Sequence, residues 1–392
     1  MPTKSWALRR AAGVSVAVVF ERVGGASALS ASDVPRSPDE VGADWLTAVL
    51  CASTPGARVS AVRALGGGVG TTTRRSLEVT YNDVGTASKL PTRLFVKCTT
   101  ALVQRLMLGL GGFLYGEPGF YSHLRPGLPI EAPTGYFGAV DPRSWRSITL
   151  VEDVVATRGA GFWTPGRTVT RRQIEDLLAN VAVWHGALWE SPELARCRWL
   201  RTPADQRRLI DALIGLADRR RIGAERARAV IAPRVRERQA DLYDGMRRSM
   251  EAASRGPGTY LHGDLHVANT YLTAGGRMGV VDWQAGLRGS WAQDVSYIVS
   301  SALEIEDRRA WERELLDFYL EHLIAAGGEA IPPEDAWSAY RAGLFYPYFA
   351  WVYTIGRSRL QPNFQPEDVS LTMIKRISAA IDDLEALRSV GL

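Results

Sequence analysis

One segment of the chain, residues 262–269 with the sequence HGDLHVAN, constrains its structure and chemistry more than any other. Asn269 lies five residues after Asp264. The spacing of apolar and turn residues predicts two short strands next, over 270–272 and 278–281, with a glycine turn between them. The second strand runs directly into Asp282. A loop followed by a hairpin therefore predicts that Asp264, Asn269 and Asp282 converge at one end of the hairpin.

These three side chains are the types that phosphoryl transfer requires. A carboxylate such as Asp264 can orient an acceptor hydroxyl and receive its proton. Mg²⁺ prefers hard oxygen ligands and keeps several positions for water and phosphate, so one amide (Asn269) and one carboxylate (Asp282) suffice to hold it. The metal neutralises charge on the phosphoryl group during transfer.

A glycine cluster earlier in the chain suggests a second clamp on the phosphates. Residues 65–71 read LGGGVGT and lie between predicted strands at 62–65 and 76–81. A glycine turn offers backbone N–H groups to phosphate oxygens without side-chain obstruction. An ordinary hairpin turn explains the cluster equally well, because the GxGxxG spacing is absent. The candidate phosphate-binding residues are Gly66, Gly67, Gly68, Gly70 and Thr71.

Lys97 ends a third predicted strand, over 94–98, and Glu117 follows it in the sequence. A lysine on the strand after a glycine turn can pair with phosphate oxygens, and a glutamate can hold that lysine in place. Pro118 indicates that Glu117 lies near a helix start or break. Taken alone, Lys97 is equally typical of an ordinary lysine at a strand end.

The distribution of patterns predicts an α+β fold in two parts. Strand patterns dominate as far as a strand over 147–151, and helical patterns follow at 174–189, 207–217, 310–325 and 336–355. We therefore predict a small β-rich part over 37–154, which binds nucleotide, and a larger helical part over 155–392, which carries the catalytic loop.

Residues 1–36 are expected to form a poorly ordered N-terminal extension. Two arginines precede an apolar run over 11–20, which resembles a weak secretory signal. Glu21 and Arg22 interrupt this pattern, so an extension is the preferred interpretation.

The composition argues against several other functions. The net charge is +5, and the arginines between 196 and 248 alternate with acidic residues at helical spacing, which is typical of a solvated helix face and not of a nucleic-acid site. No apolar run reaches the roughly 18 residues of a membrane span. Three scattered cysteines form no CxxC pair, which favours a reducing, cytoplasmic setting. We expect a monomer or a homodimer, with no nucleic-acid or membrane partner.

Several motifs resemble those of the aminoglycoside phosphotransferase and choline kinase-like superfamily, nearest its ecdysteroid kinase-like group. Residues 262–269 resemble its HGDxHxxN catalytic loop, and residues 281–284 (VDWQ) resemble its metal-binding element. Residues 150–154 (LVEDV) are similar to its hinge, and residues 117–121 (EPGFY) to its E-xx-FY helix. Residues 185–189 (HGALW) resemble a helix that packs on the catalytic loop, and Asp294 matches an aspartate that opens a helix in D-x-x-Y.

This resemblance implies a bilobal protein-kinase-like fold that uses ATP and Mg²⁺. It implies that Asp264 is the catalytic base or hydroxyl orienter, that Asn269 and Asp282 hold Mg²⁺, and that Lys97 contacts the nucleotide phosphates. Glu117 would position Lys97, and Gln284 would lie beside the metal. The implied adenine-binding hinge residues are Val151, Glu152, Asp153 and Val154. The implied supports of the catalytic loop are His262, His266 and Asp294.

The predicted function is transfer of the ATP γ-phosphate to a hydroxyl of a small molecule. Only a dozen residues separate Asp282 from Asp294, which leaves no long activation segment to dock a peptide. The aromatic stretch 340–353 could line an apolar or sugar-stacking cleft, so a neutral alcohol, a steroid-like or sugar-like molecule, or an antibiotic is expected as acceptor. The alternative is a nucleotide-binding pseudokinase that acts as a scaffold without turnover.

Overall fold

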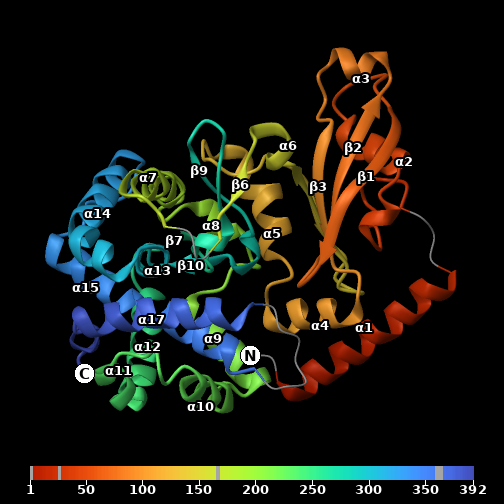
Figure 1. Ribbon diagram of the computed structural model, residues 1–392. Helices are drawn as coiled ribbons and strands as arrows, with labels where there is room; N and C mark the ends of the chain where they lie inside the picture. Colours follow the sequence, from red (N-terminus) through yellow and green to blue (C-terminus); the bar gives the residue numbers. More distant parts are fainter. Residues whose placement is uncertain (1–2, 25–27, 165–167, 358–364) are drawn as a thin grey trace. The chain divides into compact units, whose positions relative to one another are not determined.

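The computed structural model describes residues 3–24, 28–164, 168–357 and 365–392, and the chain divides into two compact units. The first unit comprises Met1–Gly127 and Pro133–Ala160, and the second comprises Leu128–Ala132 and Gly161–Leu392. A five-stranded sheet lies in the first unit, and the helices α7 to α17 lie in the second (Figure 1). The predicted α+β class, with a β-rich N-terminal part and a larger helical C-terminal part, is confirmed.

The sheet of the first unit is antiparallel throughout, in the order β1-β2-β3-β5-β4. Four predicted strands lie within or largely within β1, β2, β3 and β5. The strands are β1 (Val59–Val69), β2 (Thr73–Tyr81), β3 (Arg93–Cys98), β4 (Gly135–Val140) and β5 (Ser147–Glu152). The helices of this unit are α1 (Lys4–Gly24), α2 (Ala43–Leu50), α3 (Asp83–Ala87), α4 (Leu102–Gly111), α5 (Gly116–Gly119) and α6 (Val154–Arg158).

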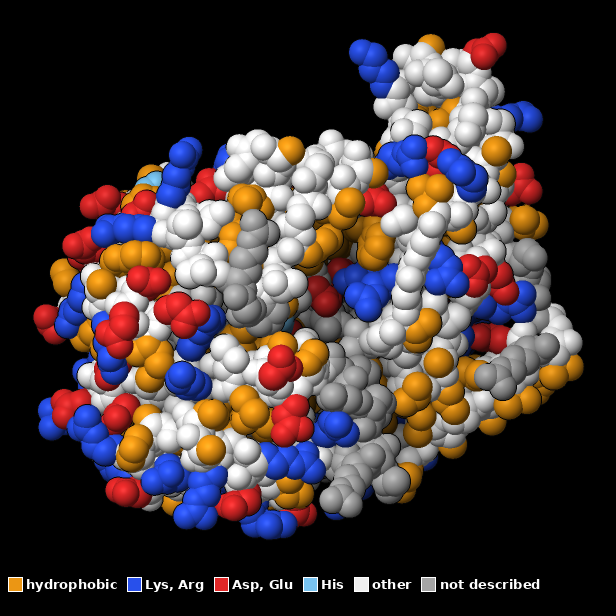
Figure 2. Space-filling model, viewed as in Figure 1, with side chains coloured by type: hydrophobic (Ala, Val, Ile, Leu, Met, Phe, Trp, Pro, Cys, Tyr) orange, Lys and Arg blue, Asp and Glu red, His pale blue; other side chains and the backbone are white. Residues whose placement is uncertain are grey.

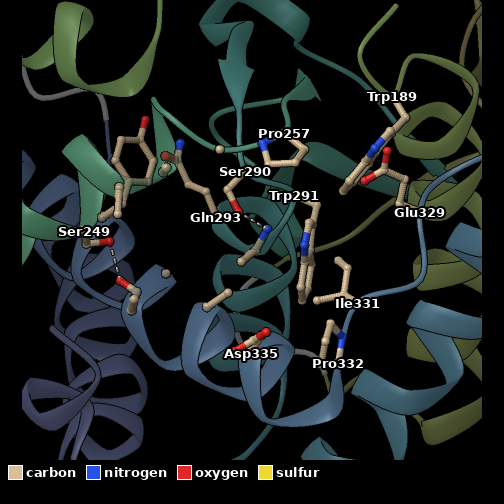
Figure 3. Close-up of a pocket in the computed structure, with 18 of the residues that line it drawn as sticks. Trp189, Ser249, Pro257, Ser290, Trp291, Gln293, Glu329, Ile331, Pro332 and Asp335 are labelled. Atoms are coloured by element: carbon tan, nitrogen blue, oxygen red, sulfur yellow. Dashed lines mark hydrogen bonds between the residues drawn. The ribbon is translucent and has the colours of Figure 1, made fainter.

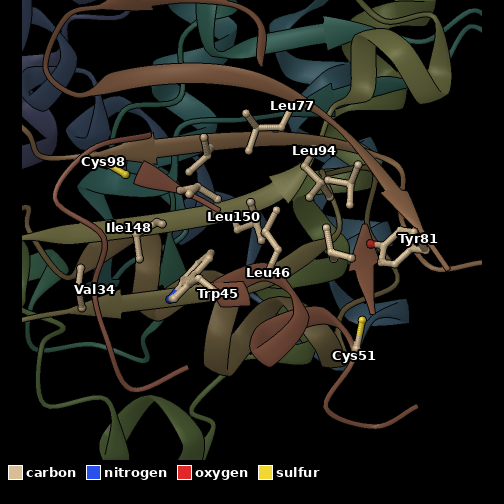
Figure 4. Close-up of a cluster of buried hydrophobic side chains, with 14 of the residues drawn as sticks. Val34, Trp45, Leu46, Cys51, Leu77, Tyr81, Leu94, Cys98, Ile148 and Leu150 are labelled. Atoms are coloured by element: carbon tan, nitrogen blue, oxygen red, sulfur yellow. The ribbon is translucent and has the colours of Figure 1, made fainter. Parts of the chain in front are cut away.

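The core of the first unit forms where α2 covers one face of this sheet (Figure 4). Trp45 and Leu46 of α2 are fully buried against strand residues such as Leu94 and Leu150. The Trp45 ring meets Phe137 of β4 edge to face, with 5.3 Å between the ring centroids. Because each fully buried side chain of this size contributes about 1.5–3 kcal/mol, this cluster holds the sheet and α2 together.

Residues 1–36 differ from the expected poorly ordered extension, because Lys4–Gly24 form the helix α1. Val14 of α1 is fully buried in a cluster with Leu108 of α4. Glu21 is ion-paired with the buried Arg105 at 2.8 Å. These contacts come from residues far away in the sequence, which is why the local pattern did not predict them. Residues 1–2 and 25–27 of this segment lie outside the described residues.

The second unit contains the helices α7 (Arg171–Ala187), α8 (Pro192–Arg196), α9 (Pro203–Ile214), α10 (Leu216–Arg226), α11 (Pro233–Glu237), α12 (Gln239–Ala253), α13 (Ala292–Ala302), α14 (Ile305–Ala325), α15 (Pro333–Gly343), α16 (Phe345–Ile355) and α17 (Glu367–Asp383). Its short strands are β6 (Gly161–Phe162), β7 (Thr259–Leu261), β8 (Thr270–Leu272), β9 (Met278–Val280) and β10 (Leu287–Gly289). They form a three-stranded sheet in the order β6-β8-β9 and a β7–β10 pair.

The single helix predicted over 336–355 is two helices, α15 and α16. The break follows Gly343, whose position allows a close approach of α13: a Cβ there would lie 2.3 Å from the Ser296 hydroxyl oxygen. The predicted helix over 207–217 also divides, at Gly215, which has a left-handed φ of +67°. Glycine adopts this conformation without the steric cost that other residues meet.

The boundary between the units differs from the predicted junction at residue 154. The second unit begins at Gly161 and also takes in Leu128–Ala132. Glu131 ties this short segment to the second unit, because its backbone oxygen accepts from Val280 N–H at 3.1 Å and its carboxylate accepts from the Tyr271 hydroxyl at 2.8 Å. The Asn180 side chain also accepts from Glu131 N–H at 2.8 Å.

Charges of both signs are interspersed over the helical surface in Figure 2. Arginines of the segment 196–248 pair with nearby carboxylates: Arg208 with Glu251 at 2.5 Å, and Arg238 with Asp241 at 2.8 Å. These pairs agree with a solvated, charge-balanced surface. No helix within the described part of the chain is long and apolar enough to cross a bilayer.

The Glu152 carboxylate generates a prediction about stability. Burial alone would raise its pKa, but hydrogen bonds from Arg158, Thr157 and Thr134 N–H outweigh burial and lower the pKa to about 2. A depressed carboxyl pKa stabilises the folded state above the unfolded pKa, and this stabilisation is lost as the pH falls toward the folded pKa. Glu152→Gln should therefore lower the free energy of unfolding at pH 7 by about 2–3 kcal/mol.

Denaturant titrations at pH 7, 5 and 3 would measure this effect. The difference between the parent and Glu152→Gln should shrink as the pH falls from 5 to 3, because protonation then removes the same charge from the parent. Glu237→Gln, a change of an exposed carboxylate, serves as the matched control and should show little difference at any pH. A Glu152→Gln difference that does not depend on pH would contradict the prediction.

Candidate active site

Lys97 and Glu117 form a buried ion pair in the first unit. Alternate residues of β3 face the core, so Leu94 and Val96 are fully buried on one face while Lys97 projects from the other. The Lys97 Nζ lies 2.7 Å from one Glu117 carboxylate oxygen and 2.9 Å from the other. Glu117 lies in the short helix α5, directly before Pro118. The side chains are only 12% and 8% exposed, so the glutamate holds the ammonium group in one position.

The glycine cluster is mostly strand and not turn. Gly66, Gly67 and Gly68 belong to β1 and pair with residues of β2, so the turn itself is limited to residues 70–72. A Cβ on Gly67 would lie 2.0 Å from the Arg74 backbone oxygen, so glycine is needed for the close approach of these strands. Gly70 N–H donates within the turn, to Thr72 O at 2.9 Å.

Gln104 fixes this turn from outside it. Its Nε2 donates to Gly70 O at 2.9 Å, and its Oε1 accepts from Thr100 N–H, also at 2.9 Å. The side chain is 2% exposed, so the turn is anchored by a buried amide. Sequence reasoning missed Gln104, because its distance from the turn along the chain gives no signal of the contact.

The predicted hinge residues Val151, Glu152, Asp153 and Val154 lie at the end of β5 and the start of α6. Within the first unit, Glu152 N–H donates to Thr134 O and Asp153 N–H donates to Arg93 O. The Asp153 side chain caps α6. Val154 N–H, at the start of α6, has no hydrogen-bond partner among the described residues.

In the second unit, hydrogen bonds to the buried Asp294 hold the loop of residues 262–269. The Asp294 carboxylate accepts from His262 N–H at 2.6 Å and from Gly263 N–H at 3.0 Å. His185 of α7 contacts the same carboxylate, with its Nε2 3.4 Å from the oxygen that accepts from His262 N–H. Gly263 has a positive φ of +76°, and a Cβ there would lie 2.2 Å from Ala285 O, so this loop shape requires glycine. Asp294 and His185 therefore set the loop conformation without reaching its exposed side.

The His262 ring connects the loop to the hairpin. Its Nε2 lies 2.9 Å from Val281 O, while its Nδ1 accepts from Asp264 N–H at 3.2 Å. These partners place the ring proton on Nε2. Val281 N–H in turn donates to Asn269 O at 2.9 Å, which sets Asn269 beside the residue that precedes Asp282. The structure thus brings the loop and both ends of the hairpin together.

The Asp264 carboxylate is held by side chains from two directions. Tyr297 of α13 donates to one oxygen at 3.1 Å, and His266 Nε2 lies 3.7 Å from the other. Burial alone would raise the Asp264 pKa, but the nearby His266 and His262 rings and the hydrogen bond from Tyr297 outweigh burial and lower the pKa. The side chain is 37% exposed. Asp264 is therefore an anchored carboxylate that can accept a hydrogen bond from outside.

The Asn269 amide is oriented by its nitrogen. Nδ2 donates to Asp264 O at 2.8 Å and lies 3.3 Å from an Asp264 carboxylate oxygen. Its Oδ1 is consequently turned away from Asp264. Asp282 adopts a left-handed backbone conformation, with φ +66°, directly after β9. One amide oxygen and one carboxylate fit a magnesium ion that keeps water and phosphate oxygens as its other ligands. Gln284 follows in a short 3₁₀ turn, Trp283–Ala285, and is half-buried.

Two tyrosines of the site were not singled out from the sequence. Tyr297 is the tyrosine of the D-x-x-Y spacing, and three positions on a helix place it on the same side as Asp294. Tyr346 of α16 donates to Gly263 O at 2.6 Å. It belongs to the aromatic stretch 340–353, but no pattern in that stretch distinguishes it from its core neighbours. Trp189, by contrast, lies beyond the end of α7, while Trp184 and His185 of that helix contact Trp283 and Asp294.

A family model described as the phosphotransferase enzyme family matches residues 114–342, more than half of the chain. The chain belongs to this family. The matched region contains Glu117, the catalytic loop, Asp282 and Asp294. Comparison with curated proteins gives no match.

Several solved structures resemble the chain at low sequence identity. The macrolide 2′-phosphotransferase of Brachybacterium faecium is 18% identical, with 78% of this chain and 93% of that chain covered and a TM-score of 0.40. A choline kinase of Cryptosporidium parvum is 12% identical, with 86% and 94% covered and a TM-score of 0.48. A choline/ethanolamine kinase family protein of Mesorhizobium loti is 15% identical, with 88% and 96% covered and a TM-score of 0.43.

The anchoring role of Asp294 is open to a direct test. Asp294→Ala leaves two buried backbone N–H groups without an acceptor, which should lower the free energy of unfolding by roughly 2–4 kcal/mol. Native-state hydrogen exchange should show faster exchange at His262 and Gly263 than at the strand β8. Asp317→Asn on the exposed surface of α14 is the control. Unchanged protection of both loop amides in Asp294→Ala would refute the anchoring role.

Proposed function

We propose that this phosphotransferase moves the γ-phosphate of ATP to a hydroxyl group of a small molecule. Asp264 orients the acceptor hydroxyl and receives its proton, and Asn269 and Asp282 hold Mg²⁺. Lys97, kept in place by Glu117, contacts the nucleotide phosphates, and the hinge at Val154 meets the adenine. When bound, the metal neutralises charge on the transferred group.

The observation that carries this proposal is the set of polar contacts around Asp264. A carboxylate with a lowered pKa stays ionised at neutral pH, and Tyr297 and His266 fix its direction. Phosphoryl transfer depends more on positioning and electrostatics than on a strong base, so an anchored ionised aspartate suits the reaction. The Asn269 amide nitrogen faces Asp264, which leaves its oxygen for the metal.

The acceptor is proposed to bind beside the ring of His266. His266 Nδ1 is buried and has no hydrogen-bond partner among the described residues. The His266 and Trp351 rings meet edge to face, with 5.2 Å between centroids. An aromatic wall with an unused polar atom suits a hydroxylated ring or alcohol. A small molecule remains the proposed acceptor class because the segment from Asp282 to Asp294 is short.

Asp264→Asn tests the transfer step. Mg²⁺-dependent ADP release would be screened over a library of alcohols, sugars and antibiotics, and the best acceptor would then be used with the variant. Asp264→Asn should reduce kcat by roughly 10²–10⁴-fold, because the amide cannot receive the proton, while ATP affinity stays nearly unchanged. Asp317→Asn should leave kcat unaltered. Full turnover by Asp264→Asn would remove Asp264 from the reaction.

The alternative, a nucleotide-binding scaffold without turnover, predicts a different outcome from the same screen. A scaffold would bind ATP and release no ADP above background with any acceptor. Acceptor-dependent ADP release that disappears in Asp264→Asn would exclude the scaffold function.

Asp282→Asn tests the proposed role of Asp282 as a Mg²⁺ ligand. Loss of one carboxylate from a two-residue magnesium site should raise the Mg²⁺ concentration for half-maximal activity by about tenfold or more, since hard carboxylate oxygens supply most of the charge. Titration of activity with MgCl₂ at fixed ATP measures this shift. Asp307→Asn on α14 is the matched control, and an identical Mg²⁺ curve for Asp282→Asn would contradict the assignment.

A further inference from the structure

A pocket of about 390 Å³ lies in the second unit (Figure 3). Its walls come from the end of α12, the turn before α13, the connection between α14 and α15, and α15 itself. None of the catalytic-loop residues 262–269 lines it, and neither does Asp282. The proposed transfer reaction therefore makes no use of this pocket.

Two tryptophans give the pocket an aromatic wall. Trp291 is 3% exposed, and its ring stacks on Tyr319 with 5.1 Å between the centroids, which fixes the plane of the indole. Trp189 lies on the same pocket, and Ile331 and Pro332 add apolar surface (Figure 3). A rigid aromatic wall favours a ligand with an apolar body or a cation that can lie against a ring face.

The charged residues of the pocket are all acidic. Glu329 and Asp335 line it, both are exposed, and neither forms an ion pair or hydrogen bond through its side chain within the described part of the chain. The lining contains no lysine, arginine or histidine. In a chain with a net charge of +5, this is a local reversal of sign. Such a rim attracts cations and repels anions.

Buried donors in the pocket have no acceptor. Gln293 is 4% exposed, and its Nε2 has no hydrogen-bond partner among the described residues. The Trp189 indole N–H is also buried and has no hydrogen-bond partner among those residues. A buried donor without a partner is unfavourable, and an oxygen atom of a ligand would satisfy it. The pocket thus offers aromatic faces, negative charge and hydrogen-bond donors together.

We infer that this pocket binds a small organic cation, a protonated amine on an apolar body with at least one hydroxyl or carbonyl oxygen. The amine lies toward Glu329 and Asp335, the apolar body lies against Trp291, and the oxygen accepts from Gln293. This site is separate from the hydroxyl that Asp264 orients. Tyr346 lines the pocket and also donates to Gly263 O at 2.6 Å, so one side chain touches both places.

Three probes with a common phenyl group test this inference in the absence of nucleotide. They are phenethylamine, its neutral counterpart 2-phenylethanol, and 2-amino-1-phenylethanol, which adds a hydroxyl to the cation. Indole N–H signals of the full chain would be followed by NMR, with Trp291→Phe to assign the Trp291 signal. Phenethylamine should shift that signal with a Kd on the order of 1 mM. It should bind about tenfold more tightly than 2-phenylethanol.

Variants distinguish the contribution of the two carboxylates to probe binding from that of the Gln293 amide. The double change Glu329→Gln and Asp335→Asn should weaken phenethylamine at least fivefold and leave 2-phenylethanol unchanged, whereas Glu334→Gln, an exposed carboxylate of α15 outside the pocket, should change neither. Gln293→Leu should weaken 2-amino-1-phenylethanol more than phenethylamine. Asp264→Asn should bind all three probes as the parent does, so the result does not depend on the proposed transfer reaction.

Three outcomes would overturn the inference. One is the absence of any Trp291 shift up to about 20 mM probe, well above the expected Kd. The second is equal affinity for the cation and its neutral counterpart. The third is loss of phenethylamine binding in Asp264→Asn, which would place the probe at the catalytic loop instead.

Discussion

The loop of residues 262–269 depends on one buried carboxylate. Asp294 accepts hydrogen bonds from two successive backbone N–H groups of the loop, and His185 contacts the same carboxylate. A buried charge of this kind is tolerated only where several donors compensate it. The cost of leaving those donors without an acceptor is what holds residues 262 and 263 in one conformation. The directions of Asp264 and of the His262 ring follow from that conformation.

Hydrogen bonds continue from the loop into the hairpin. The His262 ring reaches Val281 O, and Val281 N–H reaches Asn269 O, so the residues beside both candidate metal ligands are tied to the same short sheet. Tyr297 and Tyr346 then add side-chain bonds from α13 and α16. The loop is therefore held by hydrogen bonds from several elements of the second unit, and such positioning is what the proposed transfer would need.

In the first unit, buried polar side chains likewise hold functional groups in place. Glu117 holds Lys97, and Gln104 holds the turn after β1, and both are nearly buried. Strand alternation decides that Lys97 faces away from the core, while the run of glycines allows β1 and β2 to approach closely near residue 67. At the end of β5, the Glu152 and Asp153 N–H groups are already bound to backbone oxygens of the first unit.

The sequence by itself determined the class of fold, the strands β2, β3 and β5, the hairpin after Asn269 and the family, because these depend on local periodicity and on closely spaced motifs. It did not determine the helix α1, whose stability comes from Arg105 and Leu108, or the break between α15 and α16, which follows from contact with α13. The roles of Gln104 and Tyr346 and the pocket at Trp291 likewise required tertiary structure. In each case the deciding partner is distant along the chain, and burial brings the two together in a way that no local pattern records. The segment His262–Asn269 could be identified from the sequence because its residues are closely spaced. The contacts with Asp294 that hold its conformation could not, because Asp294 lies about 30 residues further along the chain.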